Sequence, residues 1–333
     1  MEAGILSTIG NTPLIELTKV FSPSHFRPMA KLEFFNPGGS MKDRPALTIL
    51  REGMEAGQIH PNTVIVESSS GNMGVGLAQA CAYYGLRFIC VVDPKTTTQN
   101  IRLMEAYGAH IDRVEEPDPM TGEFLQARLN RVAEIVVTTK DAFWPNQYTN
   151  LHNPLAHHQT MREVMTALDG RVDFLFCATS TCGTLRGCAE YVREHNLETK
   201  IIAVDAVGSV IFGGLSAKRL VPGHGAAVRP GLFQEDLACD CVHVTDIESI
   251  TGCRRLARAE AILAGGSSGA IITAIDRYRN KIPGGSVCVA ILPDRGERYL
   301  DTIYSEKWVR ENFGTIPHLL DGLATPAGVS VTG

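Results

Sequence analysis

A glycine-rich loop near the N-terminus carries the first residue that could do covalent chemistry. Residues 36–44 read NPGGSMKDR, and a helix is predicted to begin near Asp43. Lys42 would then lie at a helix N-terminus, where the positive end of the helix dipole opposes protonation of its amine. A lysine with a lowered pKa is a candidate for Schiff-base formation. The alternative is a solvated lysine after a turn, whereas a Walker A loop is excluded because Met41 and Asp43 flank the lysine.

A second loop is dense in hydroxyl groups. Residues 67–74 read ESSSGNMG and lie between a predicted strand and a predicted helix. Hydroxyls and backbone N–H groups at a helix start suit a carboxylate or a phosphate. One serine would suffice for an N-cap, so three serines and an asparagine exceed what capping requires. The glycines at 71, 74 and 76 match a dinucleotide fingerprint poorly, because Gln79 stands where a third glycine belongs.

Two further loops open predicted helices in the second half of the chain. Residues 179–187 read TSTCGTLRG, and their hydroxyls and N–H groups could cradle a phosphate. Cys182 has no histidine near it in sequence, so we interpret it as a small loop residue rather than a nucleophile. Residues 265–269 read GGSSG, where a serine is either an N-cap or a hydroxyl directed at a ligand.

The composition excludes several classes of function. The 333 residues include 31 basic and 36 acidic ones, so the net charge is 31 − 36 = −5, which argues against a binder of nucleic acid or of an anionic membrane. The longest apolar run, residues 287–292, is too short to cross a bilayer. No signal peptide is expected, because the first basic residue is Lys19. Nine cysteines without a C-x-x-C pair indicate a reduced, cytoplasmic protein.

Other catalytic motifs are missing from the sequence. The ten histidines form no H-E-x-x-H pattern, so no metal site is expected. His157 and His158 fall in a polar helical stretch, and we interpret them as surface residues. No G-x-S-x-G elbow supports a serine hydrolase.

The elements that must position these loops alternate between strands and helices. Apolar strands are predicted at residues 63–67, 86–92, 109–114, 173–178, 201–205 and 286–292. Helices are predicted at residues 71–84, 97–108, 122–134, 185–195 and 269–279. This alternation predicts an α/β fold of parallel sheets covered on both faces, with ligands bound beyond the carboxyl ends of the strands. Residues 208–229 are predicted to form a long functional loop, and residues 317–333 a flexible tail.

Taken together, the loops resemble the fold-type II pyridoxal-phosphate enzymes of the cysteine synthase family. The similarity runs from residues 9–14 (IGNTPL) to residues 305–308 (SEKW) and includes Asn146-Gln-Tyr148. Within the family, the closer resemblance is to N-(2-amino-2-carboxyethyl)-L-glutamate synthases of the staphyloferrin B siderophore type. That resemblance is carried by residues 39–46 (GSMKDRPA), 90–95 (CVVDPK), 114–118 (VEEPD), 203–213 (AVDAVGSVIFG) and 292–301 (LPDRGERYLD).

The resemblance implies a cofactor, pyridoxal 5'-phosphate, and roles for individual residues. Lys42 would hold the cofactor as a Schiff base, Asn72 would hydrogen-bond its ring hydroxyl, and Ser267 would face its pyridine nitrogen. The residues implied to bind its phosphate are Ser180, Thr181, Cys182, Gly183 and Thr184. The residues implied to bind the substrate carboxylate are Ser69, Ser70, Gly71, Asn72 and Met73, with Gln147 nearby.

Departures from the cysteine synthase pattern suggest a particular substrate. Ser180 and Tyr148 add hydroxyls to the substrate pocket, which suits a second substrate larger than sulfide. Arg128 is the first choice of cation for a phosphorylated leaving group, although it could equally be a solvated helix arginine. The implied reaction is β-replacement on O-phospho-L-serine by L-glutamate, catalysed by a transferase of siderophore biosynthesis. The alternatives are a cysteine synthase (O-phosphoserine or O-acetylserine sulfhydrylase), a non-catalytic scaffold protein and a nicotinamide oxidoreductase.

The family layout also implies the architecture. We expect a tryptophan synthase β-like fold with two domains, each a mainly parallel twisted sheet flanked by helices. Residues 36–145 would form a smaller, mobile domain, and residues 1–35 and 146–316 a larger, cofactor-binding one. A homodimer is expected.

Overall fold

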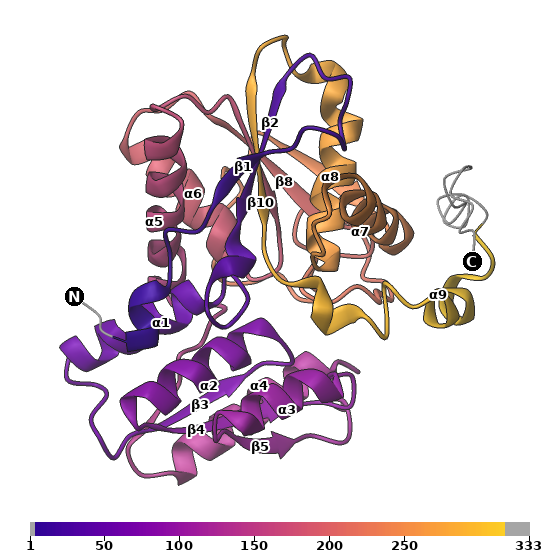
Figure 1. Cartoon of the computed structure of the whole chain (residues 1–333). Helices are drawn as coiled ribbons and strands as arrows, with labels where there is room; N and C mark the ends of the chain where they lie inside the picture. Colours follow the sequence, from indigo (N-terminus) through magenta and orange to yellow (C-terminus); the bar gives the residue numbers. More distant parts are fainter. Residues whose placement is uncertain (1–3, 317–333) are drawn as a thin grey trace, which may run out of the picture.

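The computed structural model describes residues 4–316, which form two sheets flanked by helices (Figure 1). The predicted flexible tail lies outside the described residues. The larger sheet has the strand order β1-β2-β10-β7-β8-β9 and the smaller one β5-β4-β3-β6. Except for the antiparallel pair β1–β2, all neighbouring strands run parallel. The expected α/β fold class is therefore confirmed.

The strands and helices alternate along the chain. The strands are β1 (Leu14–Glu16), β2 (Arg27–Leu32), β3 (Val64–Ser68), β4 (Arg87–Val92), β5 (His110–Arg113), β6 (Ala142–Phe143), β7 (Phe174–Ala178), β8 (Lys200–Ala206), β9 (Asp240–Val244) and β10 (Val287–Leu292). The helices are α1 (Asp43–Glu55), α2 (Asn72–Tyr84), α3 (Thr98–Ala106), α4 (Phe124–Thr138), α5 (His152–Ala167), α6 (Gly183–Glu194), α7 (Asp246–Glu260), α8 (Gly266–Tyr278) and α9 (Glu306–Phe313). None of these described helices is long and apolar enough to span a membrane.

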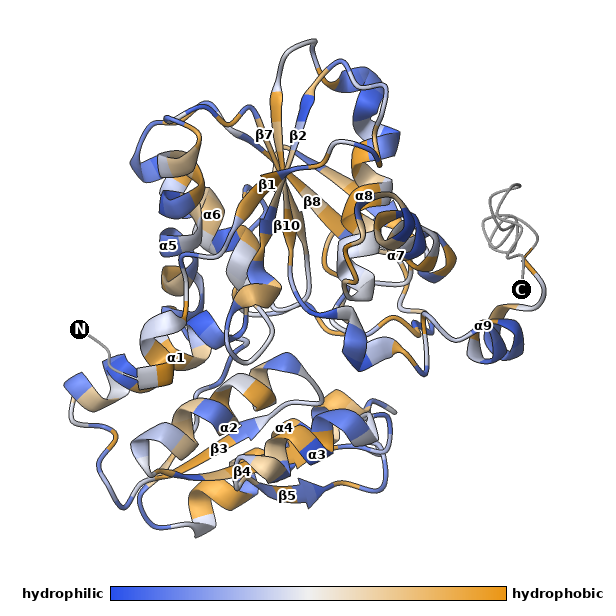
Figure 2. Ribbon diagram, viewed as in Figure 1, coloured by the Kyte–Doolittle hydropathy of each residue, from blue (hydrophilic) through white to orange (hydrophobic). Residues whose placement is uncertain are grey.

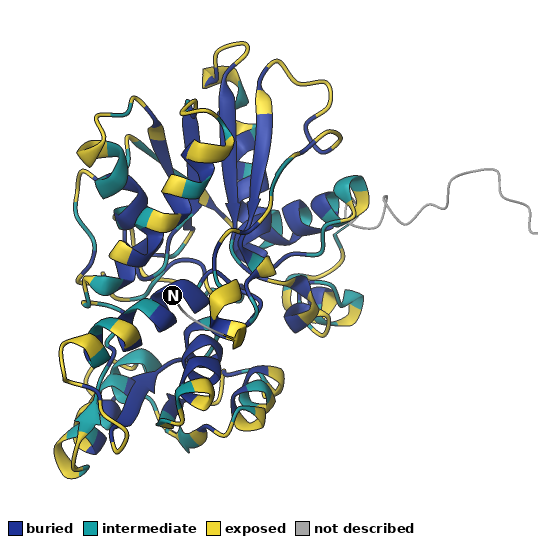
Figure 3. Ribbon diagram, turned by 60° about the vertical axis from the view of Figure 1, so that its left-hand side comes forward, coloured by how far each residue is buried: buried dark blue, intermediate teal, exposed yellow. Residues whose placement is uncertain are grey.

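Helices cover both faces of the larger sheet. Alternate residues of β10 point to opposite sides: Ala290 and Leu292 pack with α8, whereas Val289 and Ile291 pack with α5 and α6. This explains why the central strands read as continuous apolar runs, coloured orange in Figure 2. The same strands are buried in Figure 3, and exposed residues lie on the outer helix faces and loops.

The smaller sheet is built in the same way. Ile65 and Phe88 pack against α1 and α2 on one face, and Val66 packs against α4 on the other. Leu6, from the N-terminal 3-10 helix Gly4–Thr8, also packs in the first of these cores. Helix α1 therefore contributes its apolar face to the smaller sheet, while it also packs against α5 of the larger unit.

The predicted elements agree with the structure to within a few residues at each end. No helix or strand interrupts the predicted loop 208–229. The sequence prediction missed β1, β2, β6, β9, α7 and α9, and it gave no bounds for α5. Strands β1 and β6 are short, β1, β6 and β9 lie at sheet edges, and β2, α7 and α9 contain charged residues.

Candidate active site

The loop that carries Lys42 is fixed to the carboxyl end of β10. The Met41 N–H donates to the Pro293 carbonyl at 2.8 Å, and Ser40 forms an isolated bridge with Asp294. Lys42 directly precedes α1, as predicted. Burial lowers the pKa of the Lys42 amine to about 8, against the charge of Asp294. The lowered pKa was expected, but its largest cause is burial and not the helix dipole.

Asp294 joins the lysine loop to Asn72. The Asn72 amide donates to Asp294 Oδ2 at 2.8 Å, Tyr299 donates to the same oxygen at 2.5 Å, and Arg298 donates to Asn72 Oδ1. Burial raises the pKa of Asp294. Its second oxygen, Oδ1, is buried without a hydrogen-bond partner. Sequence reasoning missed Asp294, because its contacts are made only in the folded chain.

The loop before α6 turns sharply at Cys182 and packs closely at Gly183. Cys182 has φ +64°, a left-handed conformation that favours glycine. A side chain at Gly183 would overlap Asn153, whose amide donates to the Gln147 carbonyl at 2.7 Å. The loop thus comes close to its neighbours at Gly183, and Cys182 takes a glycine-like conformation. Burial raises the pKa of the Cys182 thiol to about 12, so this thiol is neutral at physiological pH.

His157 supports this loop from α5. It is fully buried, its Nε2 lies 3.2 Å from Thr184 Oγ1, and its Nδ1 lies 3.2 Å from Thr160 Oγ1. The interpretation of His157 as a surface residue is wrong, since α5 packs this face against α6. Burial, with the charges of Lys42 and Arg44, lowers the pKa of His157 well below its usual value. His158, next to it, is partly exposed beside Glu190.

Ser267 enters from the start of α8. It is buried, and the preceding Gly265 N–H donates to the Asp294 carbonyl at 3.0 Å, so α8 begins beside the lysine loop. Four helices begin here, α1, α2, α6 and α8, and in none of them does the side chain of the N-cap residue accept a hydrogen bond from a backbone N–H. Helix α7, in contrast, has a complete capping box.

The serine-rich loop is held by hydrogen bonds from below. Ser69 Oγ accepts from the N–H of Gly74 at 2.9 Å, and the Gln147 amide donates to the Ser68 carbonyl at 3.0 Å. Beneath the loop, Glu67 accepts from the Gln147 N–H at 3.1 Å, and burial raises its pKa to about 7. Met73 instead points into the apolar core, so only its backbone faces the loop.

Arg128 is buried, which excludes the solvated alternative. It lies on α4 with Nε 3.1 Å from Asp93 Oδ2, in an ion pair whose members are both less than one-tenth exposed. Burial raises the pKa of the Tyr148 hydroxyl, and the positive charge of Arg128 opposes that rise. The charges of Arg128 and Glu67 both act on the Tyr148 hydroxyl. Ser180 is partly buried at the start of the α6 loop.

The chain is similar over most of its length to a family of known enzymes. The family model described as pyridoxal-phosphate dependent enzyme matches residues 5–294. The chain belongs to this family. Its cofactor is pyridoxal phosphate, and it is an enzyme.

Solved structures of related enzymes agree. An O-acetylserine dependent cystathionine beta-synthase from Helicobacter pylori is 30% identical, with a TM-score of 0.85 over 92% of this chain and 99% of that one. A cysteine synthase from Entamoeba histolytica is 32% identical, with a TM-score of 0.85 over 91% of each chain. An O-ureido-L-serine synthase is 30% identical, with a TM-score of 0.82 over 96% of this chain and 99% of that one.

The residues present fit this cofactor. A lysine with a lowered pKa suits Schiff-base formation, and the N-terminus of α6, whose N-cap residue accepts no side-chain hydrogen bond, is a place where N–H groups can bind a phosphate. The unpartnered Asp294 Oδ1 and the buried, unpartnered Ser68 Oγ leave polar atoms without partners around Lys42 and the serine-rich loop.

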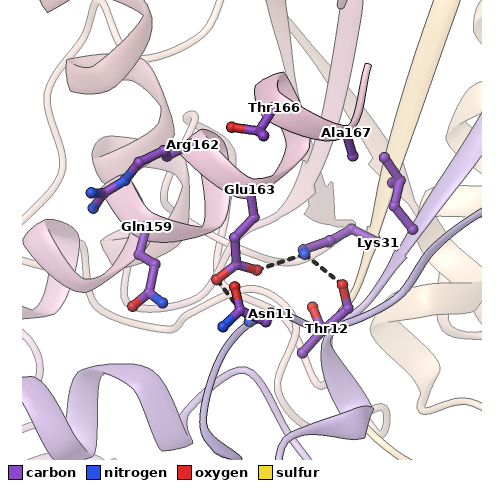
Figure 4. Close-up of a pocket in the computed structure, with 9 residues that line it drawn as sticks. Asn11, Thr12, Lys31, Gln159, Arg162, Glu163, Thr166 and Ala167 are labelled. Carbon is purple, nitrogen blue, oxygen red and sulfur yellow. Dashed lines mark hydrogen bonds and ion pairs between the residues drawn. The ribbon is translucent and has the colours of Figure 1, made fainter. Parts of the chain in front are cut away.

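A pocket of about 520 Å³ lies elsewhere, between β1, β2 and α5 (Figure 4). Its floor is an ion cluster in which Glu163 accepts from Lys31 Nζ at 2.6 Å and from both terminal nitrogens of Arg44 at 2.8 Å. Arg44 also donates to Glu33 at 2.7 and 2.8 Å. We assign this cluster a structural role, because it fixes α1, and hence Lys42, to the larger sheet.

Proposed function

We propose that the protein catalyses β-replacement on O-phospho-L-serine with L-glutamate as the nucleophile. The products are N-(2-amino-2-carboxyethyl)-L-glutamate, a precursor of 2,3-diaminopropionate for siderophores, and phosphate. Arg128 carries the proposal: it is a buried cation whose charge acts on the Tyr148 hydroxyl of the proposed substrate pocket. A dianionic phosphate leaving group requires such a cation, whereas an acetate leaving group does not. Arg128 therefore supports the first substrate, and the hydroxyls of Ser180 and Tyr148 favour a nucleophile larger than sulfide.

The cofactor and the protein divide the chemistry. Bound pyridoxal phosphate supplies the electron sink that stabilises negative charge at the substrate Cα. Lys42 acts as the general base there, because an amine with a pKa of about 8 can accept and return a proton near neutral pH. The bond from Cβ to the phosphate oxygen breaks, and a bond from Cβ to the glutamate nitrogen forms.

The remaining residues bind and orient. The proposed carboxylate site is formed by Ser69, Ser70, Gly71, Asn72 and Met73, with Gln147 holding the loop from below. The proposed cofactor contacts are Asn72 to the ring hydroxyl, Ser267 to the ring nitrogen, and the residues Ser180, Thr181, Cys182, Gly183 and Thr184 to the phosphate. Ser267 is neutral and therefore accompanies a largely unprotonated ring nitrogen, which favours elimination over transamination.

A product assay with two nucleophiles tests the reaction. The holoenzyme is incubated with phosphoserine plus glutamate and, separately, with phosphoserine plus sulfide, and the products are weighed by mass spectrometry. The proposal expects the glutamate adduct as the preferred product. Cysteine alone would favour the second candidate, a sulfhydrylase, which the likeness to a cysteine synthase supports. No Schiff-base absorption band and no change with phosphoserine would instead indicate a non-catalytic protein.

The role of Arg128 is tested separately. Arg128→Ala should raise the KM for phosphoserine on the order of 10- to 100-fold, because a charge-assisted contact is lost. The double variant Arg128→Met with Asp93→Asn avoids an unpaired buried carboxylate and controls for misfolding. An unchanged KM for phosphoserine in both variants would contradict the assignment.

The architecture around this reaction is also a proposal. Residues 36–145 form the smaller, mobile domain, which closes when the substrate carboxylate binds. Residues 1–35 and 146–316 form the larger one. We further propose that the enzyme is a cytoplasmic homodimer.

A further inference from the structure

The segment that follows the long loop is fixed against two parts of the proposed site. The Leu232 N–H donates to the Tyr148 carbonyl at 3.0 Å, and a side chain at Gly231 would come within 2.8 Å of Thr149. Leu232 is fully buried in one apolar cluster with Cys182. The segment therefore runs from the tyrosine of the substrate pocket to the loop proposed to bind the cofactor phosphate.

Arg229 opens this segment with an ordered, accessible charge. The carbon of its guanidinium lies 4.8 Å from the centre of the Phe233 ring, and Phe233 itself packs edge-on against Phe212 at 5.3 Å. Stacking on a supported ring orients the guanidinium before any ligand arrives. The Arg229 side chain is 48% exposed, so it can still be reached from solvent.

The present partner of Arg229 is weakly held. Within residues 4–316, the ion pair recorded for it is with Glu235, at 3.3 Å, and that side chain is 84% exposed. Exposed pairs of this kind contribute little, because water and salt screen them. A substrate carboxylate can therefore replace Glu235 at small cost. The charge of Arg229 also opposes the rise in the pKa of Cys182, as expected of a cation near that loop.

The anionic groups of the proposed reaction outnumber the cations assigned so far. The carboxylate of phosphoserine is given to the serine-rich loop and its phosphate to Arg128, which is buried and already paired with Asp93. Glutamate brings two more carboxylates, and neither has a cation. We propose that Arg229 binds a carboxylate of the amino-acid nucleophile and so determines the preference for a dicarboxylic amine over sulfide. This inference rests on the proposed function.

Kinetics of Arg229→Met test the proposal, because methionine retains an apolar stem over Phe233. We expect the KM for glutamate to rise on the order of 10- to 100-fold, the loss typical of a charge-assisted contact. The rate of phosphate release from phosphoserine alone, and the KM for phosphoserine, should stay within about twofold of the wild-type values, since Arg229 does not bind the first substrate. L-norvaline, which lacks the side-chain carboxylate, is then compared with glutamate as the nucleophile. If the ratio of the KM for norvaline to the KM for glutamate is smaller in the variant than in the wild type, Arg229 binds the side-chain carboxylate. If the KM values for glutamate and norvaline rise by the same factor, Arg229 binds the α-carboxylate.

Arg193→Met is the matched control. Arg193 lies on α6, its side chain is 55% exposed, and it pairs with the exposed Asp236 at 2.9 Å. Its substitution should leave both KM values unchanged. If the wild type makes the glutamate adduct and Arg229→Met keeps the KM for glutamate, the inference is wrong and the proposed function stands. If the wild type makes no adduct, the proposed function fails, and the inference fails with it.

Discussion

Among single residues, Lys42 matters most, because its surroundings disfavour the charged form of its amine. Burial lowers the pKa of Lys42 from 10.5 to about 8. At pH 7 this gives about 300-fold more free amine than an ordinary lysine has. Asp294 limits the shift, because its negative charge favours the ammonium form. The pair keeps the amine near the pH at which it can both accept and donate a proton.

This predicts how the apoenzyme takes up its cofactor. The rate of Schiff-base formation by Lys42 should rise with pH up to about 8 and then level off, because only the free amine reacts. Stopped-flow absorbance of apoenzyme mixed with pyridoxal phosphate, from pH 6 to 10, measures this rate. Lys42→Ala should show no Schiff-base absorption band. A wild-type rate that still rises between pH 9 and 10 would contradict the lowered pKa of Lys42.

At the scale of helices and strands, the position of Ser267 depends on a close helix crossing. A side chain at Gly269 would overlap the Ser249 carbonyl and the backbone of Cys253, so α8 and α7 touch through their backbones. Glycine is required here by space and not by its φ angle. The crossing fixes the start of α8 beside Asp294.

Gly269→Ala should therefore lower the free energy of unfolding by about 3 kcal/mol, since the added methyl has to push the two helices apart. Gly284→Ala is the control, because the nearest atom to a new side chain there is 3.8 Å away. Denaturant unfolding measures both. Equal effects of the two substitutions would refute the close-packing argument, and weaker cofactor binding by Gly269→Ala would show that the crossing positions the site.

Some helices and strands could be predicted from the sequence and others could not. Strands such as β7 and β10 are continuous apolar runs, and their helices follow at loops with recognisable motifs, so their existence was predicted correctly. Strand β2 contains Pro28 and Lys31, and its pairing is set by β10, far along the chain. His157 and Asn153 belong to no local motif, and Asp294 lies in the segment 292–301 without any sign there of its role. They act through contacts made after folding, so the sequence could not identify them.

At the scale of the whole molecule, the buried ion cluster links distant segments. Glu33 begins the 3-10 helix Glu33–Phe35 directly after β2, Arg44 lies on α1 and Glu163 lies on α5. Although burial opposes its ionisation, the hydrogen bonds and charge of Arg44 and the hydrogen bond of Lys31 lower the pKa of Glu163 to about 2. A carboxyl group whose pKa falls on folding stabilises the protein above its unfolded value of about 4.5, and that contribution is lost as the pH falls towards 2.

Glu163→Gln should cost about 3 kcal/mol of stability at pH 7, because it leaves Lys31 and Arg44 buried without a full counter-charge. The variant should also lose less stability than the wild type between pH 5 and pH 2. Chemical unfolding at several pH values measures this. Glu55→Gln, which removes an exposed partner of Arg51, is the control and should change little. A pH dependence identical to that of the wild type would disprove the role of Glu163.

The strand order of the larger sheet has a consequence for protein synthesis. Arg27 of β2 pairs with Val287 of β10, and 287 − 27 = 260 residues separate them. The smaller sheet, in contrast, is complete by Phe143. On the ribosome, β2 can pair early with β1, but its other edge must wait for β10 until nearly the whole chain has emerged, while the smaller sheet can already fold. We expect the nascent chain to spend most of its synthesis with this edge of β2 exposed, the period in which chaperones would have most to protect.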